Sequence, residues 1–205
     1  MKQLLFLTAI YVFLATACQN EQSVHSDDPA TAEETSLPEM SVYHLPGTWT
    51  NQDGQEFELK ELKGKVLVMV MIYTTCKAAC PRLIADMRRI EELVPEKYGD
   101  DVQYIMVSID PETDTPERLK SFAAENDMTD KRWMFIRSTP EYTREFATVL
   151  AVNYKRISPM DFSHSNIISV FDPQGEMVYQ QEGLDAKHEK TIKNIVEQAK
   201  KIGNR

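Results

Sequence analysis

Two hydrophobic patterns alternate along residues 43–205: continuous apolar runs and amphipathic stretches with helical spacing. The run at residues 66–73, Val-Leu-Val-Met-Val-Met-Ile-Tyr, is typical of a central strand that is covered on both faces. After Pro81, apolar residues at positions 83, 84, 87, 90, 93 and 94 predict a helix with one face against the sheet. Strands and helices that alternate in this way predict a layered α/β domain.

The other elements are predicted from shorter apolar runs and from two threonine-proline pairs. Thr115-Pro116 and Thr139-Pro140 each place a capping hydroxyl before a proline, which suits the first turn of a helix. In chain order we expect a hairpin at 49–59, strands at 102–109 and 133–137, helices from 115 and over 139–152, a hairpin at 167–180 and a helix at 186–202. This order predicts a thioredoxin-like three-layer sandwich with an N-terminal β-hairpin and an inserted helix over residues 43–205.

The first 18 residues resemble a bacterial lipoprotein signal. Lys2 precedes 14 almost wholly apolar residues at 4–17, which are too few for a bilayer-spanning helix of about 20 residues. Small residues stand directly before Cys18, where such signals carry the cysteine that is lipid-modified. We expect a signal peptide at 1–17, lipid on Cys18 and a membrane-anchored protein in the bacterial cell envelope, outside the cytoplasm. The alternative is an ordinary cleaved signal with an unmodified Cys18.

Composition and charge narrow the possible functions. The 205 residues include 23 basic and 32 acidic side chains, a net charge of −9, which argues against nucleic-acid binding. Residues 19–42 contain six acidic residues and no lysine or arginine, so we expect an acidic flexible tether at 18–42. Three cysteines are too few for a dense disulfide framework or a four-cysteine zinc site.

Cys76 and Cys80 lie between the predicted central strand and the helix that follows it. Ligands of open α/β sheets bind at this edge, where a helix N-terminus also favours negative charge. Together with Lys77 and Arg82, that position predicts acidic, reactive thiols. Three residues separate the cysteines, a spacing that leaves both metal binding and disulfide chemistry open.

Three stretches of the chain resemble the signatures of the Sco/SenC family. They are residues 73–81, Tyr-Thr-Thr-Cys-Lys-Ala-Ala-Cys-Pro, residues 108–117, Ser-Ile-Asp-Pro-Glu-Thr-Asp-Thr-Pro-Glu, and residues 164–175, which begin His-Ser-Asn and end Asp-Pro-Gln-Gly. The resemblance implies a thioredoxin-like, membrane-tethered protein that delivers copper to cytochrome oxidase, with Cys76, Cys80 and His164 as copper ligands. The chain departs from the family pattern at Lys77 and Ala79, where proline and a larger or acidic residue are common.

The chemistry of these residues agrees with a copper site. Thiolates favour Cu(I), imidazole also serves Cu(II), and three ligands leave one coordination position for exchange. We expect a loop before the strand at 167 to bring His164 to the cysteines. The resemblance, together with this chemistry, implies a copper metallochaperone whose partner is a membrane oxidase subunit or another copper enzyme, and we expect it to be a monomer.

Other interpretations remain open from the residues alone. Cys76 and Cys80 would also serve a thiol-disulfide oxidoreductase, as attacking and resolving thiols. A peroxidase is disfavoured because Tyr73 stands where peroxiredoxins carry threonine. We expect Asp110 and Asp114 to end a strand and cap a helix, with orientation of the site or contact with a partner as the alternative.

Most methionines of the chain are better explained as core residues than as copper ligands. Met69, Met71, Met87, Met106 and Met134 fall within predicted strands and helices, so we expect them in the core. Met160, near His164, is the one methionine that we consider as a further ligand.

Overall fold

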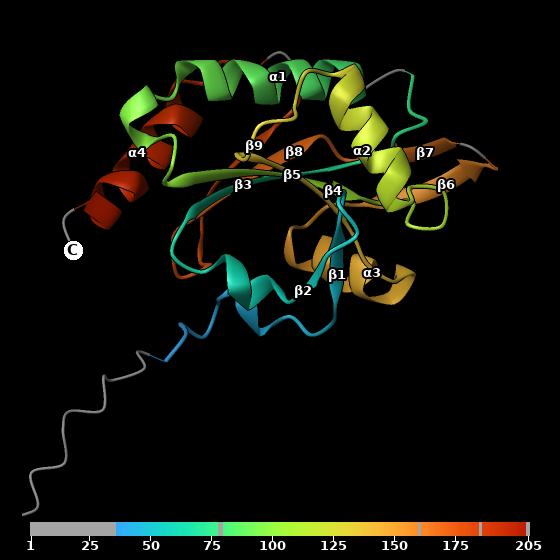
Figure 1. Ribbon diagram of the computed structural model, residues 1–205, viewed down its shortest axis with the longest axis horizontal. Helices are drawn as coiled ribbons and strands as arrows, with labels where there is room; N and C mark the ends of the chain where they lie inside the picture. The colour runs from blue at the N-terminus through green and yellow to red at the C-terminus, as the bar shows by residue number, and fades with distance from the viewer. Residues whose placement is uncertain (1–35, 78–79, 160, 185, 204–205) are drawn as a thin grey trace, which may run out of the picture. The chain divides into compact units, whose positions relative to one another are not determined.

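A computed structural model describes residues 36–77, 80–159, 161–184 and 186–203. These residues form a seven-stranded mixed sheet, a separate two-stranded sheet and four α-helices (Figure 1). The strands are β1 (Trp49–Asn51), β2 (Glu56–Phe57), β3 (Val66–Ile72), β4 (Val102–Ser108), β5 (Trp133–Arg137), β6 (Tyr154–Ser158), β7 (Asp161–His164), β8 (Ile167–Phe171) and β9 (Met177–Glu182). The helices are α1 (Cys80–Leu93), α2 (Pro116–Glu125), α3 (Pro140–Val149) and α4 (Glu189–Gly203), with 3-10 turns η1 (Val42–His44), η2 (Leu59–Leu62) and η3 (Glu96–Tyr98).

The continuous apolar runs form the middle of the main sheet. Its strand order is β2-β1-β5-β4-β3-β8-β9, and every residue of β3, β4 and β8 is buried. β3 pairs in parallel with β4, whereas β8 runs antiparallel along the other side of β3. Strands that are covered on both faces need no polar alternation, which explains their sequences.

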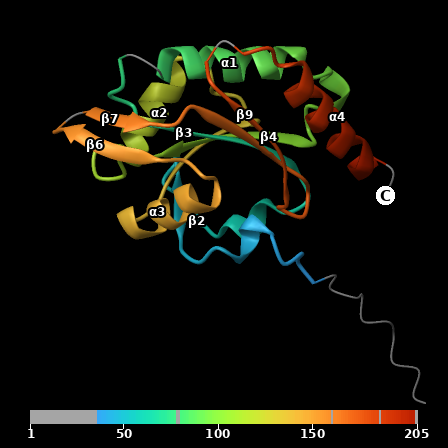
Figure 2. The same cartoon turned by 180° about the vertical axis from the view of Figure 1, so that it is seen from behind.

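Helices cover both faces of the sheet and complete three layers. α1 and α4 lie over one face and α3 lies on the opposite face, as the views from front and back agree (Figures 1 and 2). The buried stripe of α1 is made of residues 83, 84, 87 and 90. Thr115 and Thr139 cap α2 and α3 as predicted, each accepting a backbone N–H three residues on at 3.3 Å. The predicted fold class is confirmed.

The hairpin of β6 and β7 was not predicted. Its strand β6 is largely exposed and polar, so no apolar alternation marks it in the sequence. Within the described chain, β6 and β7 pair only with each other, and Tyr154 lies opposite His164. The predicted helix at 139–152 also ends earlier, at Val149, because Ala151 adopts a left-handed backbone with φ of 52°.

The predicted signal peptide, Cys18 and most of the predicted tether lie outside the described residues. The last tether residues are described, and they pack on the turn between β8 and β9. Ser41 donates its hydroxyl to the Gln174 carbonyl at 2.6 Å, and the Val42 amide donates to Gly175 at 2.9 Å. Within the described ranges, none of the helices combines the length and apolar character that crossing a membrane requires.

Candidate metal centre

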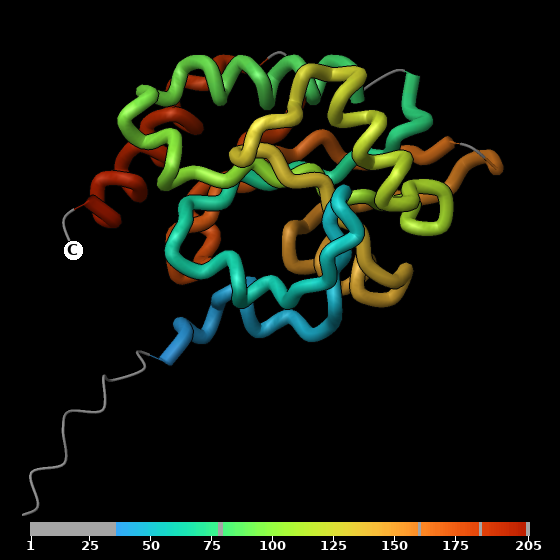
Figure 3. Tube along the Cα trace, in the orientation of Figure 1, coloured from blue at the N-terminus to red at the C-terminus, as the bar shows by residue number. Residues whose placement is uncertain are grey.

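The topology of the sheet brings the predicted ligands together although Cys80 and His164 are 84 positions apart in the sequence. Cys76 and Cys80 follow the carboxyl end of β3. Because β8 is antiparallel to β3, with Ile168 opposite Val70, the amino end of β8 lies at that same edge. The residues just before β8, including His164, therefore meet the loop after β3. In Figure 3 the orange hairpin of β6 and β7 and the green loop after β3 lie on the same side of the molecule.

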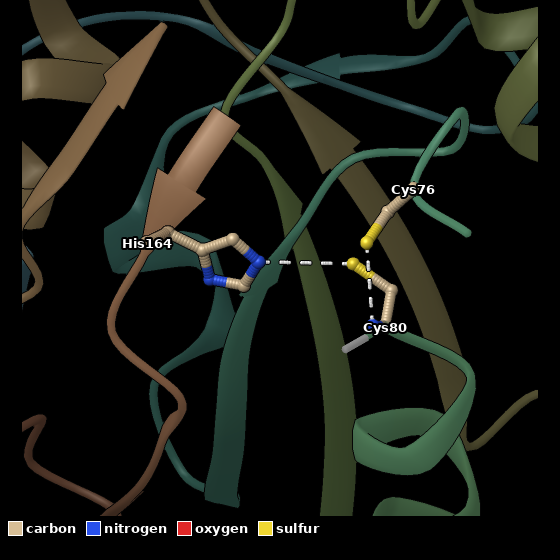
Figure 4. Close-up of side chains that lie close together, drawn as sticks. All are labelled: Cys76, Cys80 and His164. Atoms are coloured by element: carbon tan, nitrogen blue, oxygen red, sulfur yellow. Dashed lines mark hydrogen bonds between the residues drawn. The ribbon is translucent and has the colours of Figure 1, made fainter. Parts of the chain in front are cut away.

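Cys76, Cys80 and His164 form a compact group (Figure 4). Their potential ligand atoms, two Sγ atoms and a ring nitrogen, all lie within 4.8 Å of one another. The Cys80 Sγ is 3.8 Å from His164 Nε2, and both cysteines are free thiols. The predicted convergence is thus present, but His164 is the last residue of β7 rather than part of a loop.

One hydrogen bond determines which ring nitrogen of His164 carries the proton. Nδ1 lies 3.0 Å from the Ser165 carbonyl, which can only accept, so Nδ1 carries the proton. Nε2 therefore directs its lone pair toward Cys80, the arrangement that a metal-binding imidazole requires. Burial lowers the pKa of His164, which favours the neutral ring.

The two thiols have different surroundings. Cys80 opens α1 and is fully buried, whereas Cys76 is half-buried and accepts the Cys80 backbone N–H at 3.3 Å. A helix N-terminal amide stabilises negative charge on the sulfur that it contacts, which here is Cys76. The prediction of an acidic thiol is wrong for Cys80. The pKa of this thiol is raised, mainly by burial and secondly by the hydrogen bond with Cys76.

Tyr73 joins the cysteine loop to the strand that carries His164. Its hydroxyl lies 3.1 Å from Asp161 Oδ1 and 3.3 Å from the Phe162 carbonyl, and it accepts the Phe162 N–H at 3.3 Å. Its ring packs edge-on against those of Phe162 and His164. In the sequence Tyr73 ends an apolar run and begins the first signature, but its partners in β7 lie about 90 positions away, so this role could not be predicted.

Asp114 holds the start of the cysteine loop and does not cap α2 as predicted. The cap is Thr115, while the wholly buried Asp114 accepts the Thr74 hydroxyl at 2.5 Å and the Ser108 hydroxyl at 2.6 Å. Arg118 adds a bond from Nε to Thr74 Oγ1 at 3.1 Å. Of the two alternatives, orientation of the site therefore applies to Asp114.

Asp110 connects the loop after β4 to the hairpin instead of serving as a cap. It pairs with Arg156 of β6 at 2.8 Å, and the Arg156 guanidinium lies 4.5 Å from the centre of the Phe162 ring. Asp110 is itself buried. A strand does end beside Asp110, since β4 stops at Ser108, but the cap of α2 is Thr115 and neither aspartate.

The methionines of the predicted elements lie in the core. Met69, Met71, Met87 and Met106 are buried, and Met134 packs against the same cluster while partly exposed. Their place in the core confirms the prediction. Met160 and Ala79 lie outside the described residues, whereas Lys77 is exposed.

Comparison with known proteins agrees with this geometry. The sequence model of the SCO1/SenC family matches residues 39–200. A SCO1 protein homolog of Bacillus subtilis (strain 168) is 30% identical over 143 residues, which make up 68% of this chain and 74% of the relative.

Solved structures show the same fold. Bradyrhizobium japonicum ScoI with copper bound is 26% identical, with a TM-score of 0.60 over 75% of this chain and 97% of that one. BsSco, a member of the Sco family of cytochrome c oxidase assembly proteins in which a disulfide switch was identified, is 27% identical, with a TM-score of 0.66 over 77% and 94%. With a family match across most of its length, a common fold and the cysteine and histidine residues in place, this chain belongs to the SCO1/SenC family.

Proposed function

We propose that this protein binds one copper ion through Cys76, Cys80 and His164 and delivers it to a copper enzyme outside the cytoplasm. The observation that carries the proposal is the approach of two thiol sulfurs and one imidazole nitrogen to within 4.8 Å of one another. The nitrogen already directs its lone pair at the sulfurs, so binding needs little reorganisation of the ring.

The donor set suits copper cargo. Thiolate sulfur selects Cu(I), and imidazole is a ligand for both Cu(I) and Cu(II). Cys80 is held as a neutral thiol by burial, so its proton must leave when a metal binds. Three protein ligands leave a position at which an acceptor's ligand can attach before the ion departs.

A respiratory oxidase is the acceptor that the comparisons favour. BsSco belongs to a family described as cytochrome c oxidase assembly proteins, and B. japonicum ScoI is a copper-bound relative. The three sequence signatures support the same acceptor class. Another copper enzyme of the cell envelope would use the same transfer chemistry.

Copper titration of four variants tests the binding site. We expect the reduced protein to take up one copper ion, whether copper is supplied as Cu(I) or as Cu(II), and the Cu(II) form to show sulfur-to-metal charge-transfer absorption. Cys76→Ser, Cys80→Ser and His164→Ala should each lower the affinity, because each removes one donor. His44→Ala is the matched control, since this exposed histidine bonds only the Pro38 carbonyl in the described structure. Unchanged Cu(II) binding by His164→Ala would refute the site.

Thiol-disulfide exchange is a second candidate function, favoured by two free thiols at close range. In this reaction the Cys76 thiolate, the more exposed sulfur, attacks a partner disulfide and releases one partner thiolate. Cys80 then loses its proton and attacks Cys76, which forms the internal disulfide and frees the second partner thiol. His164→Ala separates the two functions, because it removes a copper donor but neither sulfur.

We also propose that lipid on Cys18 anchors the protein to a membrane in the cell envelope. The apolar segment at 4–17 and the small residues before Cys18 support this proposal. The intact mass of protein purified from membranes tests it directly. A mass increase of a diacylglycerol and an acyl chain on a chain that begins at Cys18 supports the anchor, whereas an unmodified Cys18 rejects it.

A further inference from the structure

A groove of about 460 Å³ lies beside the metal centre, between strand β6 and helix α3. Its walls include Arg144 and Ala147 of α3, Lys155 and Arg156 of β6, and Phe162 of β7. We call it the β6–α3 groove. Ala147 and Phe162 are buried, so the groove has an apolar floor below a charged rim.

The groove runs along an open edge of β6. Three consecutive residues of β6, at 154–156, line it, although neighbouring side chains of a strand point to opposite faces; residues 152 and 153, which also line it, precede the strand. A groove lined by neighbouring residues of β6 reaches the backbone edge of that strand, and Phe162 of β7, opposite Arg156, shows that it also borders one face of the hairpin. In the described chain β6 pairs only with β7, so alternate backbone N–H and C=O groups of β6 point away from its partner.

The rim of the groove carries two cations, Arg144 and Lys155. Among the described residues, Arg144 and Lys155 form no ion pair, and both are exposed. The acidic residues of the groove, Asp110 and Glu112, instead face Arg156, at 2.8 and 3.8 Å. The protein as a whole has a net charge of −9, so this rim is a local positive feature on an acidic molecule.

We propose that the β6–α3 groove binds an extended acidic segment of a partner protein. The segment adds a strand to the open edge of β6, and its carboxylates pair with Arg144 and Lys155. Strand addition supplies backbone hydrogen bonds for affinity, and side chains at alternate positions supply specificity. Paired charges on the rim steer the approach of the partner.

A partner that docks in the β6–α3 groove lies close to the metal centre. Tyr154 in β6 lies opposite His164 in β7, so a segment on the outer edge of β6 is one strand away from the histidine. A copper acceptor that docks there comes within reach of the cysteines. This assignment of the partner as the copper acceptor rests on the proposed function, whereas peptide binding by the groove does not.

A peptide titration followed by NMR tests the proposal on the reduced, copper-free protein. The probe is a capped octapeptide of alternating valine and glutamate. We expect shift changes at residues 144–148 and 152–156, and slower hydrogen exchange of β6 amides. Arg144→Glu with Lys155→Glu should weaken binding at least about tenfold. Lys63→Glu with Lys200→Glu changes the net charge equally at exposed positions outside the groove and should bind as the original protein does.

Two further peptides separate charge from strand pairing. Replacing glutamate by glutamine should abolish binding, and replacing central valines by proline should weaken it because proline lacks the N–H that a ladder needs. Equal binding by the Arg144→Glu/Lys155→Glu variant, or by the proline peptide, would overturn the proposal. Dimerisation through β6, seen by sedimentation and reduced by the same double variant, would instead identify a second copy as the occupant and also overturn it.

His164→Ala distinguishes failure of this proposal from failure of the proposed function. The variant lacks a copper donor but keeps both walls of the groove, so it should bind the peptide normally. If the His164→Ala variant binds both the peptide and copper as the original protein does, the metal assignment fails and the groove proposal stands. If copper binding falls as expected and the original protein binds no peptide, only the groove proposal fails.

Discussion

Burial sets the protonation of two of the three proposed copper donors. Desolvation favours the neutral form of each group, and it therefore raises the pKa of the Cys80 thiol and lowers the pKa of the His164 ring. His164 is ready to donate its lone pair near neutral pH, while Cys80 must first lose a proton. The copper-free site is thus held in an uncharged form at these two positions.

The raised pKa of Cys80 predicts how the free energy of unfolding depends on pH. The pKa of Cys80 is higher in the folded than in the unfolded chain, so its contribution is fully present below about pH 8.5 and is lost as the pH rises toward the folded value. In urea unfolding between pH 7 and 10, the advantage of the original protein over Cys80→Ser should shrink as the pH rises. A constant difference across this range would contradict the raised pKa.

Tyr73→Phe removes the hydroxyl that joins the cysteine loop to β7 but keeps the ring. We expect a loss of about 1 kcal/mol in the free energy of unfolding and faster amide hydrogen exchange in β7. Copper affinity should fall severalfold because His164 is held less firmly. Tyr142→Phe is the control, since its hydroxyl makes no hydrogen bond within the described part of the chain. An unchanged exchange rate in β7 would rule out this role for Tyr73.

Among the elements, those with strong local signals could be predicted from sequence. The buried strands β3 and β4 are continuous apolar runs, and Thr115 and Thr139 mark helix starts through their own side chains. The β6–β7 hairpin carries no such pattern, because it is exposed and polar and its position depends on contacts made by Tyr73 and Arg156.

In the candidate site, too, some residue roles could be predicted from sequence and others could not. Its ligands could be predicted because two of the three signatures contain them and the order of the strands places them at one edge. The roles of Asp110 and Asp114 could not, since each depends on partners that only the tertiary structure brings near, such as Arg156 and Thr74.

Asp114 ties three elements together, and its loss should be costly. Asp114→Ala leaves the buried hydroxyls of Thr74 and Ser108 without their acceptor, for which we expect a loss of about 3 kcal/mol in the free energy of unfolding. Asp100→Ala, which removes an exposed ion pair with Lys131, should change stability by less than about 1 kcal/mol. Urea unfolding of both variants measures the contrast, and equal losses would show that Asp114 has no special structural role.

At the scale of the whole molecule, copper binding should stabilise the fold because the three donors meet only in the folded chain. A ligand at about 100 times its Kd adds about 2.7 kcal/mol to the free energy of unfolding. We therefore expect Cu(I) to raise the Tm of the original protein and to have little effect on Cys76→Ser/Cys80→Ser. Equal shifts in both proteins would place the bound copper elsewhere.

X-ray absorption at the copper edge tests the central claim most directly, because it counts the atoms bound to the metal. For the protein loaded with one equivalent of Cu(I), we predict two sulfur donors and one imidazole nitrogen, with the nitrogen lost in His164→Ala and one sulfur lost in Cys76→Ser or Cys80→Ser. An imidazole signal that persists in His164→Ala, or a site without two sulfurs in the original protein, would contradict the account.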